Sequence, residues 1–80
     1  MTEMPELTPV ERRILVLVVE GRTNGLIRAR LGLGSKALAL HLRSLYQKSG
    51  IHQPYAPYNL REIRQRLVEW GRYYFSQEGY

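Results

Sequence analysis

Residues 7–51 read LTPVERRILVLVVEGRTNGLIRARLGLGSKALALHLRSLYQKSGI, and this stretch decides the fold that the sequence predicts. Glycines at 21, 32 and 50 divide it into three helical segments, because glycine commonly follows a helix in the left-handed conformation. The middle break comes after a segment of about two turns, and a further helix follows it. This spacing is typical of a helix-turn-helix, whose second helix is presented to a DNA groove. We therefore predict an all-α fold built on that motif.

The first helix carries strong start and stop signals. Thr8 offers an N-cap oxygen, Pro9 suits the first helical position and Glu11 completes a capping box. Gly21 ends the helix. Its apolar side is wide enough to predict burial on most faces, and it consists of Val10, Ile14, Leu17 and Val18, widened by Leu15, Val16 and Val19.

The second and third helices are predicted from caps and apolar spacing. Thr23 caps a short helix that runs to about Leu31 and ends at Gly32. Ser35 is the predicted N-cap of the third helix, which ends before Gly50. The apolar stripe of the third helix consists of Leu38, His41, Leu42 and Leu45. A lone histidine on such a stripe is expected in the core.

Residues 8–51 form the predicted helix-turn-helix core, and a further segment flanks it at each end. Residues 1–7 form a lead-in, and the prolines and tyrosines of residues 52–58 predict a loop. A C-terminal helix is expected over residues 59–75, with Asn59 as its cap. Its apolar side chains recur at spacings of three and four, as in a heptad seam: Leu60, Ile63, Leu67, Trp70 and Tyr74. The architecture expected is four helices with an extended aromatic C-terminal helix.

The amino-acid composition limits the classes of function that the chain can have. Twelve basic and seven acidic residues give a formal charge of +5 and a pI near 10.0, which favours a polyanionic partner. Eighty residues form one domain with a thin core, so oligomerisation would help its stability. The chain has no cysteine, which fits a cytoplasmic protein without a disulfide or thiolate zinc site. Its longest apolar run, Ile14 to Val19, is too short to span a membrane.

Enzymatic chemistry is not expected. His52 has no aspartate in the chain to orient it and no cysteine beside it, so neither a catalytic triad nor a metal site can be assembled with ordinary spacing. The glycines at 32 and 34 lack the strand and the spacing of a nucleotide-binding loop. We predict no catalytic residue, no metal and no cofactor.

More than half of the chain resembles the LuxR-type (GerE-like) DNA-binding domain of bacterial transcription regulators. The residues that carry the resemblance are Leu7, Thr8, Pro9, Glu11, Arg12, Glu20, Gly21, Thr23, Asn24, Ile27, Leu31, Gly32, Lys36, His41, Leu45, Lys48, Gly50 and Ile51. The resemblance implies that the helix after Gly32 reads DNA and that the C-terminal helix dimerises. The implied dimer interface is the seam Leu60, Ile63, Leu67, Trp70 and Tyr74.

Three features depart from the family pattern. Family members place Thr and Lys where this chain has Ala37 and Ala39, and the neighbouring Leu40 is unusually apolar for a groove-facing position. Arg28 stands where the motif usually has a small alanine between its helices. Either its stem extends outward, or the interhelical angle opens, or Ala29 takes the packing position. The third departure is the Pro/Tyr loop before a long last helix.

The predicted DNA contacts lie on the second and third helices. Exposed side chains of the third helix reach bases or phosphates, and those flanking the second helix reach the phosphate backbone. The set consists of Arg22, Thr23, Arg30, Ser35, Lys36, Ala39, Leu40, Arg43 and Lys48.

The leading hypothesis is a transcription regulator that binds double-stranded DNA as a homodimer and has no enzymatic activity. The alternative is a helix-turn-helix module that has lost DNA readout and binds another regulatory protein through Ala37, Ala39, Leu40 and the aromatic last helix. A third possibility is nucleic-acid coating without sequence preference, driven by counterion release alone.

Overall fold

The computed structural model describes residues 4–51 and 60–78. Within these ranges the chain forms helices and no strand, which confirms the predicted all-α class. The loop predicted at residues 52–58 and the cap predicted at Asn59 lie outside the described residues. The helices in chain order are α1 (Pro9–Val19), α2 (Asn24–Leu31), α3 (Ser35–Ser49) and α4 (Leu60–Gln77).

Local hydrogen bonds explain where the first two helices begin. The hydroxyl of Thr8 accepts from the backbone N–H of Glu11 at 3.1 Å, and the Glu11 carboxylate accepts from the Thr8 N–H at 2.8 Å. This confirms the predicted capping box. The Thr23 hydroxyl accepts from the N–H of Leu26 at 3.2 Å and caps α2, as predicted.

The start of α3 differs from the prediction by one residue. Gly34, and not Ser35, is the N-cap, with extended backbone angles and no side-chain cap hydrogen bond. The N–H of Leu38 donates to the Gly34 carbonyl at 3.0 Å, so the first helical turn closes one residue earlier than a Ser35 cap requires. Ser35 is therefore the first residue inside α3. At the other end Gly50 takes the left-handed conformation, with φ 74°, as predicted.

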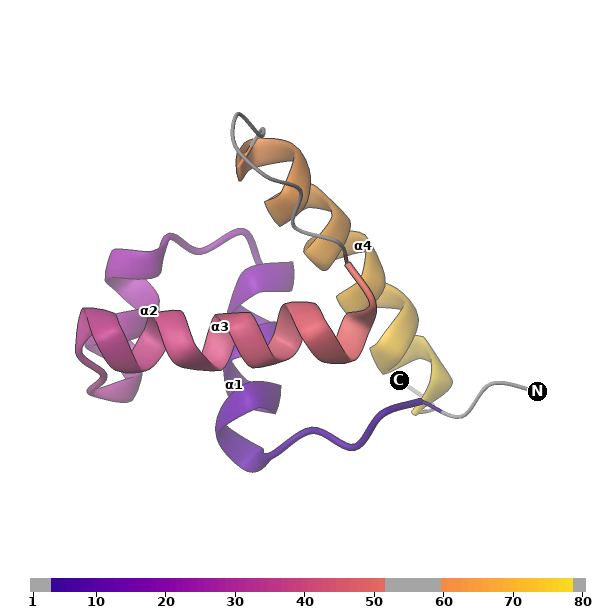
Figure 1. Ribbon diagram of the computed structural model, residues 1–80, viewed down its shortest axis with the longest axis horizontal. Helices are drawn as coiled ribbons and strands as arrows, with labels where there is room; N and C mark the ends of the chain where they lie inside the picture. The colour runs from indigo at the N-terminus through magenta and orange to yellow at the C-terminus, as the bar shows by residue number, and fades with distance from the viewer. Residues whose placement is uncertain (1–3, 52–59, 79–80) are drawn as a thin grey trace.

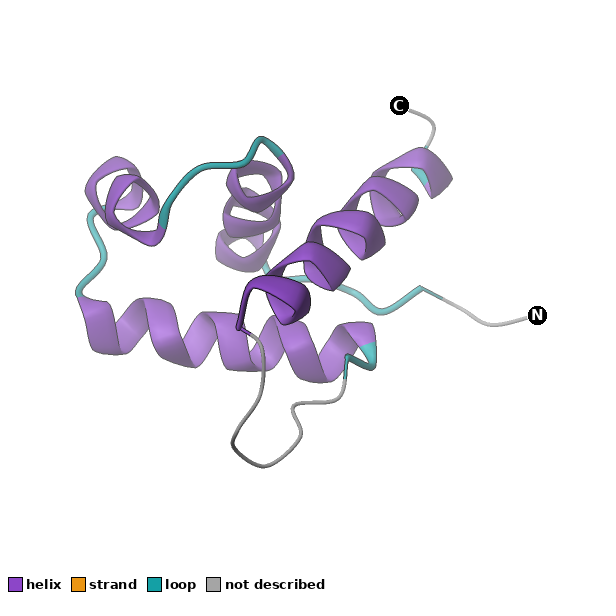
Figure 2. Cartoon of the chain, turned by 90° about the horizontal axis from the view of Figure 1, so that it is seen from above, coloured by secondary structure: helices purple, strands orange, loops and turns teal. Residues whose placement is uncertain are grey.

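The helices leave one side of α3 open (Figure 1). α1 packs most extensively against α4 and next against α3. Seen from above in Figure 2, α1, α2 and α4 all lie on the same side of α3, and no described helix covers its opposite side. The buried apolar core is shared by all of the helices and consists of Ile14, Leu15, Leu17, Val18, Ile27, Leu38, Leu42, Leu45, Ile63, Leu67 and Tyr74.

α1 is less covered than its composition predicted. Val10 and Val16 are 36% and 38% exposed, because α3 and α4 pack on other sides of the helix and leave these two facing solvent. The polar Glu11 is instead buried, with only 3% of its surface exposed. Met4 and Leu7 of the lead-in pack against the core.

The seam of α4 packs against its own chain, which corrects the predicted dimer interface. Ile63, Leu67 and Tyr74 are buried in the core, and Trp70 is partly buried against it. Only Leu60, 68% exposed, is open to a partner. A spacing of three and four residues indicates that one face of a helix is covered, but not whether the same chain or another copy covers it. Because the chain is short, it needs the apolar side of α4 to cover the side of α1 that α3 leaves open.

Gly71 sets the distance between α4 and α1. It is buried on the face of α4 that contacts α1. A Cβ atom at this position would lie 2.5 Å from Cγ2 of Val19 and 2.9 Å from Cδ1 of Leu15. The absence of a side chain at this position therefore allows the close approach of the two helices, at a cost in helix propensity of about 0.5–1 kcal/mol relative to alanine.

We expect Gly71→Ala to destabilise the protein although alanine is the better helix former. Forcing an extra methyl into a packed contact costs about 1–3 kcal/mol, against a gain in helix propensity of about 0.5–1 kcal/mol, so we expect a net loss of up to about 2 kcal/mol. Urea unfolding measures it. Gly25→Ala is the matched control, since its Cβ would meet nothing closer than the Thr23 hydroxyl at 3.9 Å. In a Val19→Ala background part of the cost should disappear, because the contact with Leu15 remains. A more stable Gly71→Ala protein would contradict the close approach.

Candidate nucleic-acid interface

The uncovered side of α3 presents a row of exposed side chains at helical spacing. Leu38, Leu42 and Leu45 hold the opposite side of the helix in the core. Because α1, α2 and α4 lie on the core side, no described helix shields this row (Figure 2). We call it the outer face of α3, and it consists of Ser35, Lys36, Ala39, Leu40, Arg43 and Gln47, of which Ser35 and Ala39 form the edge that borders α2. Five of the predicted DNA-contacting residues are on it, and Gln47 was not predicted.

Charge is distributed unevenly along the chain. Residues 21–51 contain none of the seven acidic residues. They contain half of the twelve basic residues, namely Arg22, Arg28, Arg30, Lys36, Arg43 and Lys48. The remainder of the chain therefore has more acidic than basic residues, and the positive potential is concentrated over α2, α3 and the turn before them. This segregation is visible in the sequence but is hidden in the net charge of +5.

The predicted contacts of α2 are exposed. Arg22 and Thr23 lie in the turn before the helix, and Arg30 lies in its last turn. The Thr23 hydroxyl is engaged as the cap of α2. The Nε of Arg22 lies 3.5 Å from a carboxylate oxygen of Glu20, and about half of each side chain is exposed, so this ion pair is weak.

The structure places the Arg28 side chain outside the core. The side chain is exposed and lines a shallow cleft between α2 and α3 beside Leu38 and Ala39. Ala29 is also exposed and does not take the packing position, which belongs to the fully buried Ile27. The stem of Arg28 therefore extends outward, and its charge adds to the basic surface of α2.

Lys48 does not belong to the outer face of α3. Its ammonium lies 2.6 Å from the carboxylate of Glu11 and donates to the backbone carbonyl of Glu6 at 3.2 Å. The hydroxyl of Ser44 donates to the other carboxylate oxygen of Glu11. Lys48 therefore ties α3 to α1 and to the segment before α1, so we leave it out of the candidate interface.

Glu11 is a buried anion stabilised by its hydrogen bonds. Burial by itself raises the pKa of its carboxyl group. Hydrogen bonds from Lys48, Ser44 and the backbone N–H of Thr8 outweigh burial and lower the pKa from 4.5 to about 2. The sequence predicted the capping role of Glu11 but not this contact with α3, because its partners are 33 and 37 residues away.

His41 was predicted to lie in the core, but it is partly exposed. Its position is at the edge of the buried stripe of α3. Over residues 4–51 and 60–78, no three His or Glu side chains gather in a group that could hold a metal ion. In the same ranges no helix combines the length and the apolar character that crossing a bilayer requires.

A scan against models of protein families, a search of curated proteins and a search of solved structures each found no match.

Proposed function

We propose that this protein is a DNA-binding transcription regulator in which α2 and α3 form a LuxR-type helix-turn-helix and α3 enters the major groove. The observation that carries the proposal is the outer face of α3, which is exposed, basic and uncovered by any described helix. Its 15 residues span about 22 Å, which suits a helix lying along the groove. Residues 21–51 contain no carboxylate that would repel a phosphate.

Some side chains of the outer face are suited to contacts with base edges, and others to contacts with phosphates. Lys36 and Arg43 are long donors suited to guanine edges or phosphates, while the methyl group of Ala39 suits a thymine methyl. Arg22 and Arg30 of the α2 region suit the backbone beside the groove. Of the two alanines that replace family contacts, only Ala39 is exposed, whereas Ala37 is partly buried.

Selection from random duplexes tests the proposal. The purified chain is incubated with a pool of random duplexes at several salt concentrations, and the retained DNA is sequenced. We expect enrichment of a defined motif, with an affinity that falls as salt rises. Salt-sensitive retention without enrichment would support non-specific coating, and no retention at ~50 mM salt would contradict DNA binding.

We also propose that two copies bind together, through side chains of α4 that the core leaves exposed and not through the buried part of the predicted seam. Leu60 and Tyr73 are the large apolar side chains exposed on α4, at 68% and 55%. A palindromic motif in the selection would support two copies for each site, since operator symmetry mirrors protein symmetry. A motif without symmetry would support a single copy.

The second candidate function is a protein-binding module, and the exposure of Leu40 favours it. Leu40 is 59% exposed in the middle of the outer face of α3. Apolar side chains at the centre of a presented surface are typical of protein interfaces. Of the aromatic side chains proposed to assist it, Tyr73 is exposed, whereas Tyr74 is buried.

A single substitution measures how much Leu40 contributes to DNA binding. Leu40→Gln should leave folding within about 0.5 kcal/mol of wild type, because the side chain is mostly solvated. For a DNA reader we expect less than about a tenfold change in duplex affinity, since an aliphatic side chain makes no bidentate base contact. Titration of a labelled duplex measures it. A larger loss of duplex affinity would contradict this reading of Leu40 as a minor DNA contact.

A further inference from the structure

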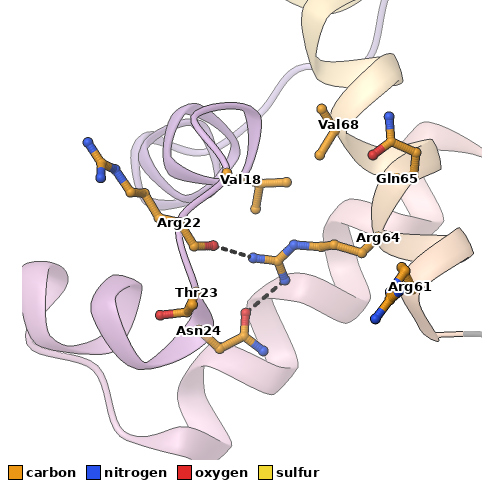
Figure 3. Close-up of a pocket in the computed structure, with 9 residues that line it drawn as sticks. Val18, Arg22, Thr23, Asn24, Arg61, Arg64, Gln65 and Val68 are labelled. Carbon is orange, nitrogen blue, oxygen red and sulfur yellow. Dashed lines mark hydrogen bonds between the residues drawn. The ribbon is translucent and has the colours of Figure 1, made fainter.

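A cleft lies between the turn that joins α1 to α2 and the first turns of α4, and arginines line it. Figure 3 shows Arg64 reaching across this cleft from α4, with Arg61 on the turn before it. Arg22 lies on the opposite wall and turns its carbonyl toward Arg64, while its side chain points away. The cleft encloses about 450 Å³, enough for a phosphate group, and no acidic residue lines it.

Arg64 is held in place by uncharged partners. Its guanidinium donates to the Asn24 side-chain oxygen at 2.7 Å and to the Arg22 carbonyl at 3.0 Å. The Tyr46 phenol of α3 is near Arg64; burial raises the pKa of that phenol, and the positive charge of Arg64 acts in the opposite direction. None of these partners carries a negative charge, so the contacts orient the guanidinium without neutralising it.

Arg61 is also available to an anion, whereas the Arg22 side chain points away from the cleft. Arg61 is exposed and makes no ion pair with a described carboxylate. Arg22 has only the weak exposed pair with Glu20. Arg66, two turns along α4 from its start, differs because it pairs with Glu62 at 2.9 Å on a neighbouring face. The unneutralised charge of α4 in this region is therefore at Arg61 and Arg64.

The cleft lies close to α3. The α1–α2 turn and the first turns of α4 both lie above α3 in Figure 1, and Arg64 is near Tyr46 of α3. A helix in the major groove, which is about 12 Å wide, has a wall of phosphates on each side. For a duplex on the outer face of α3, we expect the cleft to face one of these walls.

We infer that this cleft binds a phosphate of the DNA backbone, with Arg61 as the direct contact and Arg64 as a second donor fixed against the α1–α2 turn. The inference rests on the proposed function and extends it, because it makes α4 a DNA-contacting element. Its ligand is a phosphodiester group, and its contribution is independent of base sequence. It also gives a use to charges on α4 that core packing does not require.

Salt-dependent binding of a labelled duplex tests the inference. The logarithm of the association constant K falls as the logarithm of the salt concentration rises. Removing one phosphate contact makes this negative slope shallower by about 0.9 and weakens binding about 5–10-fold near 100 mM salt. We expect this of Arg61→Gln, with base preference unchanged in the random-duplex selection. Arg61 is chosen over Arg64 because Arg64 also ties the α1–α2 turn to α4. Arg72→Gln is the matched control, since Arg72 is exposed on the same helix and does not line the cleft.

The outcomes separate this inference from the proposed function. A loss of slope in Arg61→Gln but not in Arg72→Gln supports the phosphate site. Equal losses in both variants, or none in either, overturn it while wild-type binding leaves the proposed function standing. If the wild-type chain binds no duplex at ~50 mM salt, both fail together.

Discussion

Replacing Lys36 and Arg43 together by glutamate is expected to weaken specific duplex binding about 100-fold or more at ~100 mM salt. Each good base or phosphate contact is worth about 1–3 kcal/mol, and reversal of the charge adds repulsion from the same phosphates. Both side chains lie on the outer face of α3 and make no ion pair with a described carboxylate. Titration of a duplex from the selection, followed by fluorescence anisotropy, measures the effect.

Folding and net charge are controlled separately for this variant. Both substitutions are exposed, so the free energy of unfolding should stay within about 0.5 kcal/mol of wild type. Arg13→Glu with Arg72→Glu changes the net charge by the same amount on the exposed sides of α1 and α4. An equal loss of affinity in this control would show a net-charge effect. Wild-type affinity in Lys36→Glu/Arg43→Glu would contradict the assignment of the reading face to α3.

Glu11→Gln is expected to destabilise the protein at pH 7 by about 1–3 kcal/mol. Glutamine retains the capping box but removes the negative charge that pairs with Lys48. The loss is limited because 31% of the Lys48 side chain is exposed, and water partly solvates the ammonium that is left. For a domain whose total stability is about 5–10 kcal/mol, this is a large fraction.

The same ion pair predicts a pH dependence. Because folding lowers the pKa of Glu11 from 4.5 to about 2, its contribution is fully present above pH 4.5 and is lost as the pH falls toward 2. The shift corresponds to roughly 3 kcal/mol across that window. Urea unfolding at pH 7, 4.5 and 3 measures it. Glu11→Gln should lose less stability than wild type over this range.

A matched substitution isolates the contribution of Glu11. Glu69→Gln removes a carboxylate from the exposed side of α4 and should change the free energy of unfolding by no more than about 0.5 kcal/mol at pH 7. If wild type and Glu11→Gln lose stability in parallel between pH 4.5 and 3, the buried ion pair does not determine the acid sensitivity.

Local signals in the sequence predicted the helices well. The caps at Thr8 and Thr23 and the stop at Gly50 depend on residues within a few positions, and each occurs as expected. The outer face of α3 also follows from local spacing, because the leucines that face the core leave Lys36 and Arg43 outside.

Contacts between distant segments could not be predicted in the same way. Lys48 was expected on DNA because its sequence position gives no sign of Glu11, its partner 37 residues away. Gly71 carries no signal until α1 is placed against it. The seam of α4 was correctly read as a covered face, but periodicity alone does not say which chain covers it.

The central claim, that α3 meets DNA through its outer face, is tested most directly by NMR. The ¹⁵N-labelled chain is titrated with a duplex from the selection, and the amide shifts are followed residue by residue. We expect the largest changes from Ser35 to Arg43 and in the turn before α2, with the exposed side of α4 beyond its first turns unaffected. Changes confined to that side of α4, or none at saturating duplex, would contradict it.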